Sequence, residues 1–354
     1  VAAAGGTPLA ELLASPTRQK ASPVMIAGAT AILSDLAARG VVHAVLGLGG
    51  TQGTPNCTAV MRALPYGFPK VMLSTLASGD TSAFVGIKDV TMMFSVSDIL
   101  GLNPLSRTIL ANAAGAALGM AEQEVPVEPS ADGRPVIGMT NLGVLTEGST
   151  RALRLFAGKG YEVIVFHAVG SGGRAMEQMM KDGLIGAVFD YALGEIADEV
   201  FGGLRAGGAE RLTVAGKLGL PQVLCPGGAE HIGLLVDPPN SVPERYREHL
   251  HVFHNPVVFA PRLSPDELEQ VAQEIGARLS HTKGRAVMLL PKRGVSRYSA
   301  KDGALFDPEG DQAFLEALRK NLPAAIEVVE VDANAEDETF VREAVERLVR
   351  MIEA

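Results

Sequence analysis

Short apolar runs alternate along the chain with longer segments in which apolar residues recur at helical spacing. In the first part of the chain each apolar run ends in small or polar residues, with glycine, serine and threonine prominent. Strands that alternate with helices in this way are typical of parallel βαβ units with buried strands. The predicted strands are residues 41–48, 70–74 and 90–95, and the predicted helices are residues 24–38, 57–64 and 106–120.

The first 22 residues are expected to be irregular. A segment rich in Pro, Glu and Gly at residues 123–135 interrupts the pattern, and we place a domain boundary there, between residues 1–130 and 131–354. The same alternation then resumes, so both parts predict α/β, Rossmann-like, doubly wound parallel-sheet domains with a cleft between them. The later predicted strands are 136–139, 162–167, 187–191, 221–225 and 286–290, and the later helices are 146–157, 174–181, 195–200, 265–279 and 337–352.

Composition and charge narrow the possible function classes. Apolar residues make up 47% of the 354 residues, which is enough for a large buried core. The net charge is −9 and no basic stripe occurs, so we expect no nucleic-acid partner. No run approaches about 18 uninterrupted apolar residues, the length of a membrane helix, so we expect no membrane span.

The two cysteines, Cys57 and Cys225, lie far apart and suggest neither a disulfide framework nor a metal cluster. We interpret both as buried, unreactive thiols, and a reducing, cytoplasmic location fits them best. Glycine is in excess, with 40 residues, whereas Trp is absent. Several of the glycines come directly after predicted strands, which directs attention to those turns.

The first glycine-rich turn, at residues 47–54 (GLGGTQGT), follows a predicted strand and precedes a predicted helix. Such a turn exposes backbone N–H groups beside a helix N-terminus, an arrangement suited to phosphate. It lacks the final Lys-Ser/Thr pair of a P-loop and the strict GxGxxG spacing of a dinucleotide site. The alternative is a tight turn that needs glycine only for packing. The nucleotide ligands expected here are Gly49, Gly50, Thr51, Gly53 and Thr54.

A second polar group follows the next predicted strand, at residues 74–80 (STLASGD). Because the carboxyl ends of adjacent parallel strands converge on one crevice, we expect these hydroxyls near the first turn. Asp80 is a candidate to hold Mg²⁺ through water, and the alternative is a helix cap formed by Ser78 or Asp80. The candidate ligands here are Ser74, Thr75, Gly79 and Asp80, together with Ser95 after the third strand.

The second half carries its densest group of chemistry-bearing residues at 163–177 (VIVFHAVGSGGRAME). His167 ends a predicted strand and is a candidate catalytic acid or base near neutral pH. Arg174 follows a glycine turn and suits a carboxylate or phosphate, and Glu177 is a third catalytic candidate on the same helix. A single histidine is more often structural, and that alternative stays open.

Other polar residues are harder to assign. Glu230 and His231 follow a later predicted strand and are candidates to extend the same crevice. The HxHxxH pattern at residues 249–254 lacks standard zinc spacing, so we assign no metal site, and residues 254–256 are expected to form a turn. The sequence contains no serine-hydrolase elbow, zinc-protease, CxxC or kinase motif.

Several long blocks of the sequence occur in a distinctive order. They are GLGGTQGT (47–54), FPKVMLSTLASGDTSAFVG (68–86), KDVTMMFSVSDILGLNPLSRTILANAAGAALGM (88–120) and YEVIVFHAVGSGGRAME (161–177), followed by PQVLCPGG and HNP. Together they resemble the Tm-1-like, or UPF0261, ATP-binding family, from about residue 25 onward. The resemblance implies a pair of Rossmann-like domains and ATP binding by the first, at positions 49–54, 74–80 and 95.

Two features of the family are not found in the sequence. The family usually opens with a further strand-helix unit that carries an Asp-Thr-Lys-Gly-like loop, so we expect a nucleotide site that lacks this part. Plant members carry an additional TIM-barrel domain and inhibit a tobamovirus replication protein. The sequence has no such barrel, so the antiviral role is not carried over.

Together these features predict a nucleotide-binding metabolic enzyme that uses ATP, with or without Mg²⁺. Its substrate is expected to be a small carboxylated or phosphorylated molecule bound in the interdomain cleft. Two other functions stay open, a non-catalytic nucleotide-dependent protein-binding module and a sugar-nucleotide epimerase or transferase. Besides a small-molecule substrate we expect no nucleic-acid partner, no membrane partner and a homo-oligomer.

Overall fold

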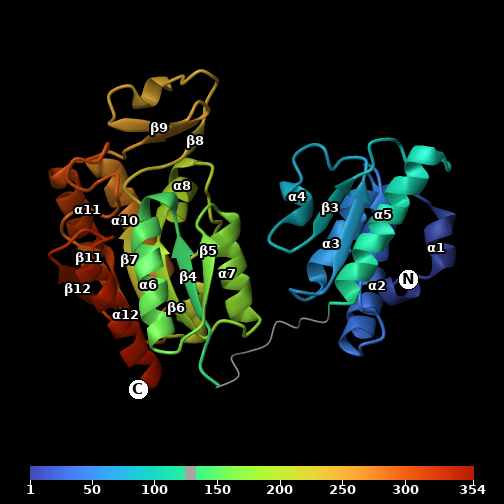
Figure 1. Cartoon of the computed structure of the whole chain (residues 1–354), viewed down its shortest axis with the longest axis horizontal. Coiled ribbons are helices and arrows are strands. Elements are labelled where there is room, and N and C mark those ends of the chain that lie inside the picture. Colours follow the sequence, from blue (N-terminus) through green and yellow to red (C-terminus); the bar gives the residue numbers. More distant parts are fainter. Residues whose placement is uncertain (124–132) are drawn as a thin grey trace. The chain divides into compact units, whose positions relative to one another are not determined.

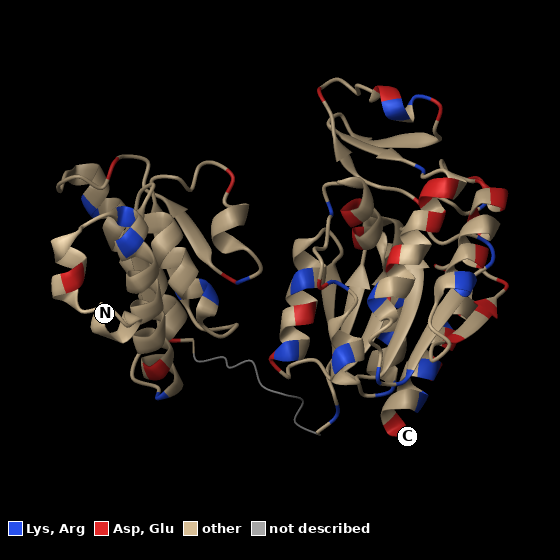
Figure 2. Cartoon of the chain, turned by 180° about the vertical axis from the view of Figure 1, so that it is seen from behind, with Lys and Arg blue, Asp and Glu red and all other residues tan. Residues whose placement is uncertain are grey.

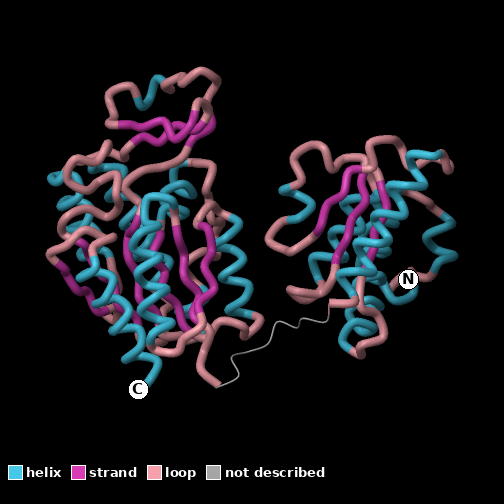
Figure 3. Tube along the Cα trace, in the orientation of Figure 1, coloured by secondary structure: helices cyan, strands magenta, loops and turns pink. Residues whose placement is uncertain are grey.

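The computed structural model describes residues 1–123 and 133–354 (Figure 1). The chain divides into two compact units, unit 1 (Val1–Glu128) and unit 2 (Pro129–Ala354). Each unit has a sheet of parallel strands flanked by helices (Figure 3), so the α/β class predicted from the sequence is confirmed. The predicted boundary between residues 130 and 131 lies outside the described residues.

Unit 1 contains a three-stranded parallel sheet in the order β1-β2-β3, so that each strand lies beside the next one in the chain. The central strand is buried along its whole length, and helices α3 and α5 both contact β1 and β2. The small core includes Met61, Met72 and Val90. The elements are η1 (Ala3–Gly5), α1 (Leu9–Ala14), α2 (Arg18–Ala38), β1 (Val45–Gly49), α3 (Gly53–Ala63), β2 (Lys70–Ser74), α4 (Ser82–Val85), β3 (Thr91–Phe94) and α5 (Pro104–Ala121).

Unit 2 contains a six-stranded parallel sheet in the order β12-β11-β7-β6-β4-β5. The chain passes from β4 to β5 on one side and then returns to β6 on the other, which is the doubly wound reversal. Its strands are β4 (Ile137–Asn141), β5 (Val163–His167), β6 (Ala187–Ala192), β7 (Gln222–Gly227), β11 (Ala286–Pro291) and β12 (Glu327–Val331). Its helices are η2 (Gly143–Leu145), α6 (Thr146–Gly158), α7 (Ser171–Lys181), α8 (Gly194–Phe201), α9 (Val214–Leu218), η3 (Glu244–Tyr246), α10 (Pro265–Leu279), α11 (Pro308–Asn321) and α12 (Glu338–Glu353).

A small antiparallel sheet in unit 2 was not predicted from the sequence. It consists of β8 (Leu234–Leu235), β10 (Val258–Pro261) and β9 (His251–Asn255), in that order. Asn255 Oδ1 accepts hydrogen bonds from the backbone N–H groups of the two residues after Pro256. The turn lies at residues 256–257 rather than at the predicted 254–256, because His254 and Asn255 belong to β9. These strands are short and β9 contains two histidines, so their apolar pattern is weak.

The prediction that residues 1–22 are irregular is wrong, because α1 and the start of α2 lie there. The Thr17 side chain caps α2 by accepting a hydrogen bond from Lys20 N at 3.3 Å. Pro23 lies close enough to this end to cost the helix only one backbone hydrogen bond. The next helix, α3, also begins earlier than predicted, at Gly53 rather than at residue 57.

Unit 1 carries few charged residues, as Figure 2 shows. In α2 no charged residue lies between Lys20 and Asp35. This helix is the one helix in the described part of the chain that is long and apolar enough to cross a membrane by length and composition. A single helix of this kind near an N-terminus is weak evidence for a membrane span.

Candidate functional site

The carboxyl ends of β1, β2 and β3 bring the first glycine turn and its neighbouring hydroxyls together. Gly49 of β1 lies opposite Ser74 of β2, which in turn lies opposite Phe94 of β3. Thr75 N donates to Gly49 O at 3.2 Å, and Ser95 N donates to Ser74 O at 3.1 Å. The residues that follow the three strands therefore form one continuous rim, which we call the unit 1 rim.

Glycine is needed in this turn for close approach, since neither Gly49 nor Gly50 has a positive φ. A Cβ at Gly49 would lie 2.6 Å from Gly53 Cα, and one at Gly50 would lie 3.1 Å from Thr75 Oγ1. The close contact lets α3 begin directly at the turn, where Thr54 N donates to Gly50 O at 2.9 Å. Thr51, at the tip, is exposed.

Three of the predicted hydroxyl ligands are buried and bonded within the protein. Thr54 Oγ1 and Ser74 Oγ lie 2.6 Å apart, and Ser74 Oγ also accepts a hydrogen bond from Leu76 N at 2.9 Å. Ser95 Oγ donates to Ser97 O at 2.7 Å. These hydroxyls hold the turns in place beneath the rim, and the accessible groups of the rim are those of the glycine turn itself.

Gly79 and Asp80 lie in the exposed loop between β2 and α4. Asp80 Oδ1 accepts a hydrogen bond from Ser82 N at 2.9 Å, and this bond lowers the pKa of the Asp80 carboxyl group. The N-cap of α4 is Thr81, so the alternative that Ser78 or Asp80 is the N-cap is wrong, although Asp80 bonds the amide of Ser82, the first residue of this helix. The other carboxylate oxygen takes no part in this bond, so Asp80 keeps an oxygen for a further contact.

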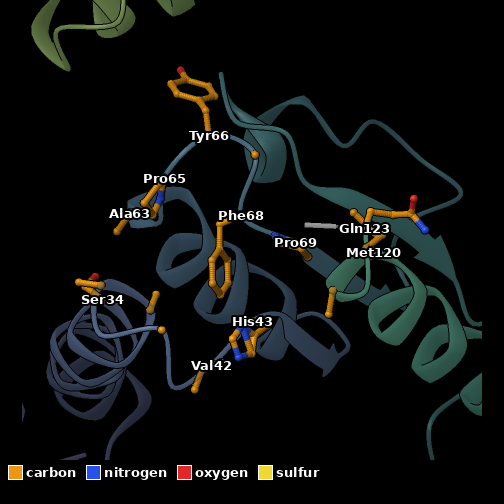
Figure 4. Close-up of a pocket in the computed structure, with 15 residues that line it drawn as sticks. Ser34, Val42, His43, Ala63, Pro65, Tyr66, Phe68, Pro69, Met120 and Gln123 are labelled. Carbon is orange, nitrogen blue, oxygen red and sulfur yellow. The ribbon is translucent and has the colours of Figure 1, made fainter. Parts of the chain in front are cut away.

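A hollow of about 900 Å³ lies at the opposite edge of the unit 1 sheet (Figure 4). Its lining includes His43 and Phe68, which precede β1 and β2, and Met120 near the end of α5. Among the described residues that line it, none is Lys, Arg, Asp or Glu. Because ligands of open α/β sheets bind outside the carboxyl ends of the strands, this hollow is not our candidate site.

The glycine turn after β5 in unit 2 holds an anion that the protein itself supplies. Glu195 Oε1 accepts hydrogen bonds from Gly170 N at 2.6 Å and from Gly173 N at 3.1 Å. Glu195 is fully buried, and Arg211 Nε donates to its other oxygen at 2.6 Å. The amides that would contact a bound phosphate here are therefore occupied by an internal carboxylate.

Arg211 also contacts two further carboxylates in the interior of unit 2. Its guanidinium donates to Asp190 at 2.5 and 2.6 Å, and it lies 3.4 Å from Glu177 Oε1. Glu177 accepts further hydrogen bonds from the amides of Leu212 and Val214. Burial raises the pKa of Glu177, and the charge of Arg211 offsets only part of that rise. These contacts place Glu177 in a buried framework behind the turn.

His167 and Arg174 occupy different environments. His167 ends β5, is exposed, lines a pocket and has its Nδ1 3.3 Å from Asn141 O. Arg174 is exposed on the first turn of α7 and is not among the residues that line this pocket. The structure thus brings His167 to a concave site, whereas Arg174 and Glu177 lie outside it.

The pocket that His167 lines, which we call the unit 2 pocket, has a volume of about 370 Å³. Its walls come from segments after β4, β5, β7 and β11, from the loop between α8 and α9, and from strands β9 and β10. It therefore lies at the carboxyl edge of the sheet, where the winding reverses between β4 and β6, a common ligand position in open α/β folds. Its polar lining side chains are His167, Arg205, His231, His254, Arg297 and Tyr298.

Glu230 and His231, both candidates from the sequence, form a buried pair at this pocket. His231 Nδ1 lies 3.2 Å from Glu230 Oε1, at the distance but not the angle of a hydrogen bond, and Ser296 Oγ donates to the same oxygen. Burial acts to raise the pKa of Glu230, but His231, Ser296 and Arg262 outweigh it and hold this pKa at about 2. Glu230 is therefore a carboxylate at neutral pH.

Two of the three histidines of the HxHxxH segment, His249 and His251, contact backbone carbonyl groups. His249 Nδ1 contacts Arg262 O at 2.7 Å, and His251 Nδ1 contacts His249 O at 2.9 Å. Within residues 1–123 and 133–354, no group of three or more His, Cys, Asp and Glu side chains is placed to hold a metal ion.

The environments of the two cysteines agree with their interpretation as unreactive thiols. Both are free, Cys225 is buried and Cys57 is half-buried. Burial raises the pKa of each thiol above its ordinary value. Neither is therefore activated as a nucleophile.

The two arginines that line the unit 2 pocket, Arg205 and Arg297, belong to no sequence motif. Arg205 lies in the glycine-rich loop between α8 and α9, and Arg297 lies in the loop after β11. Since β11 was predicted from the sequence, Arg297 carried the same signal as His167, a polar residue shortly after a strand end. Arg205 carried no such signal, because a helix separates it from its strand.

Two family models match the chain, and both describe the Uncharacterised protein family UPF0261. The model of the N-terminal domain matches residues 1–126, and that of the C-terminal domain matches residues 134–352. A UPF0261 protein of Clostridium tetani is 38% identical over 354 residues, which cover 100% of this chain and 87% of that protein.

Two further relatives extend the comparison. A UPF0261 protein of Mesorhizobium japonicum is 41% identical over 287 residues, which cover 80% of this chain and 70% of that protein. The ToMV resistance protein Tm-1 of Solanum lycopersicum is 34% identical over 278 residues, which cover 78% of this chain and 37% of that protein. The chain is thus similar to proteins of both bacteria and a plant.

Proposed function

The chain belongs to the UPF0261 family, and from this premise we propose that it binds a nucleotide, ATP, at the unit 1 rim. We propose further that it is a metabolic enzyme whose small carboxylated or phosphorylated substrate binds in unit 2. The observation that carries the nucleotide proposal is the continuous rim itself, with a glycine turn that leads directly into α3.

The chemistry of the rim suits phosphate. Backbone amides of a turn and of a helix N-terminus supply a local positive potential without a charged side chain. The net charge of −9 therefore does not oppose phosphate binding at this place. Thr51 and Thr75 add hydroxyl donors, and Asp80 is the residue that would hold Mg²⁺ through water.

Exposed apolar side chains near the rim offer a surface for the adenine base. Leu48 precedes the glycine turn, and Phe94 and Val96 lie on either side of Ser95. All three side chains are exposed, although Leu48 and Phe94 lie near the carboxyl ends of sheet strands. A base resting on them would remove this apolar surface from water.

The substrate part of the proposal rests on the unit 2 pocket. His167 lines this pocket from a strand end, where an imidazole is suited to act as an acid or base near neutral pH. Arg174 as an anion clamp and Glu177 as a catalytic group stay predictions from the sequence, since neither lines the pocket.

Titration of the full chain with ATP and ADP, with and without Mg²⁺, tests the nucleotide proposal by thermal shift. A ligand that binds only the folded state raises Tm by linkage. The variant Thr51→Glu places a carboxylate at the exposed tip of the turn, so we expect the Kd for ATP to rise by about tenfold or more.

Thr91→Glu is the matched control. Thr91 is exposed at the amino end of β3, at the opposite edge of the same sheet, so its ATP-induced shift should equal that of the wild type. The proposal is contradicted if no nucleotide shifts the Tm of the wild type. It is also contradicted if the two variants show equal Tm shifts with ATP.

We also propose a cytoplasmic location and a homo-oligomeric state. The two free cysteines support a reducing compartment, and closed homo-oligomers are common among soluble enzymes. Light scattering coupled to gel filtration tests the oligomeric state, and a mass equal to one chain would contradict it.

A further inference from the structure

We infer that the unit 2 pocket binds a small organic carboxylate, which Arg205 and Arg297 recognise. The inference deepens the proposed function, on which it rests, by naming the substrate class of this site and the residues that select it. It requires no nucleotide at the unit 1 rim, so the two proposals can fail separately.

The charges that line the pocket favour an anion. Two arginines and three histidines line it, and among its described lining residues none is Asp or Glu. Arg205 is 5% exposed and the buried Asp198 balances its charge, so it offers an anion a directed N–H donor in a largely desolvated position, where a hydrogen bond is stronger than in water. Arg297 is exposed, and its Nη2 donates to Gly143 O at 2.9 Å, which ties it to the loop after β4.

The hydrogen bonds of Arg205 leave one of its donors over. A guanidinium group carries five N–H donors. Nε and Nη2 both donate to Asp198 Oδ2, Nη2 donates also to His231 O, and Nη1 contacts His231 Nε2. These contacts use four donors, so one Nη1 hydrogen has no partner among the contacts of the described residues. A buried donor without a partner is costly, and a ligand oxygen would satisfy it.

His231 acts on this site as a positioning residue. Because arginine can only donate, the 3.4 Å contact with Arg205 Nη1 requires a lone pair on His231 Nε2. The other ring nitrogen, Nδ1, lies 3.2 Å from Glu230 Oε1, without the angle of a hydrogen bond. The imidazole therefore contacts Arg205 on one side and faces the Glu230 carboxylate on the other.

The surroundings of the pocket favour a carboxylate over a phosphate. The nearby amides of Gly170 and Gly173, which would cradle a phosphate, already bind Glu195. Recognition is left to the arginine side chains, whose planar donors match a planar carboxylate. The remaining lining is largely aliphatic, including Val144 and Val258, and its volume of about 370 Å³ suits a short apolar body.

Isothermal titration calorimetry of the full chain tests this inference. The probes are glycolate, pyruvate, succinate, benzoate and citrate, with inorganic phosphate for comparison. We expect at least one of the carboxylates to bind at millimolar concentration or below, and to bind more tightly than phosphate. Arg297→Gln should raise its Kd by about tenfold, because a charge-assisted hydrogen bond is lost.

Arg293→Gln is the matched control, because Arg293 is an exposed arginine of the same loop that does not line the pocket. Its side chain contacts Asp332 instead, so carboxylate affinity should be unchanged. Arg205→Lys keeps the buried positive charge but loses the planar set of guanidinium N–H donors. It should weaken carboxylate binding at least as much as Arg297→Gln. If Arg205→Lys does not fold, the two exposed variants decide the matter.

Three results would overturn the inference. They are binding of none of the carboxylates, equal affinity in the two exposed arginine variants, and tighter binding of phosphate than of any carboxylate. Titration of the same samples with ATP distinguishes this failure from a failure of the nucleotide proposal. If the wild-type chain binds ATP but no carboxylate, only the carboxylate inference is contradicted. If it binds a carboxylate but no ATP, only the nucleotide proposal is contradicted.

Discussion

Two glycine turns have the same position in the sequence pattern, but they differ in the structure in whether an internal carboxylate bonds to their amides. Each follows a parallel strand and leads into a helix, at residues 49–53 in unit 1 and 170–173 in unit 2. In unit 2, Glu195 fills the turn and bonds two of its amides. In unit 1 the tip of the turn is exposed at Thr51.

The difference shows that a glycine turn after a strand predicts a place for an anion but not the source of that anion. In unit 2 the protein supplies the anion from α8, and Arg211 balances its charge from behind. The turn thereby becomes part of the framework, and a neighbouring pocket with its own arginines becomes the candidate site. In unit 1 no carboxylate of the described residues is hydrogen-bonded to the turn, and this difference is why we propose the ligand site there.

The largest effect is expected from Glu195→Gln. The change removes a buried charge that faces Arg211 and two amides, and breaking such a network typically costs about 3–5 kcal/mol. Unfolding in urea, followed by circular dichroism, measures the loss of stability.

The unit 1 turn supplies the counterpart to this measurement. Gln52→Ala, at the tip of that turn, removes only exposed contacts with Ser22 and Asn56, so it should cost less than about 1 kcal/mol. Equal costs for Glu195→Gln and Gln52→Ala would contradict the view that only the unit 2 turn is filled from within.

The next effect concerns the glycines themselves. A Cβ at Gly173 would overlap Glu195 Oε2 and Arg211 Nε, whereas a Cβ at Gly50 would meet only Thr75 Oγ1, at 3.1 Å. Overpacking of a rigid interior costs about 1–3 kcal/mol, so Gly173→Ala should lie in or above that range. Gly50→Ala should cost less than about 1 kcal/mol, because the Thr75 side chain is free to shift. Thermal unfolding of the two variants measures the difference. A lower Tm for Gly50→Ala than for Gly173→Ala would contradict the prediction.

The fold was predictable to a large extent because its strands are short apolar runs between glycine turns. The predicted bounds of β2 and α10 agree with the structure, residue for residue. The small antiparallel sheet and β12 were missed, since β9 and β12 mix histidine or glutamate with apolar residues and β8 and β10 are very short. The N-terminal helices were missed because small residues and prolines favour a loop reading even where a Thr17 cap allows a helix.

The candidate sites were predictable only in their location. Parallel strands place the residues after their carboxyl ends at one edge, so the grouping of Gly49, Ser74 and Ser95 followed from the strand pattern alone. The sequence did not predict that Glu195 fills the unit 2 turn. Glu195 lies on the helix after the next strand, and no local signal links it to Gly170. Arg205 was missed for the same reason, since only tertiary packing brings it beside His231.

The smallest effect is expected from the pH dependence of one carboxylate near each turn. Burial raises the pKa of Glu177 in unit 2, and a hydrogen bond from Ser82 lowers that of Asp80 in unit 1. The folded state therefore holds the Glu177 proton more tightly than the unfolded state, so this contribution to stability falls as pH rises above 4.5 through the raised pKa. The contribution of Asp80 to stability is present above pH 3.8 and is lost as pH falls through the lowered pKa.

Urea unfolding of Glu177→Gln and Asp80→Asn between acid and neutral pH tests these two signs. The difference in unfolding free energy between each variant and the wild type should change with pH in opposite directions for the two variants. Because Asp80 is exposed, its slope should be the shallower. Slopes of the same sign would show that the two carboxylates do not differ as their surroundings imply.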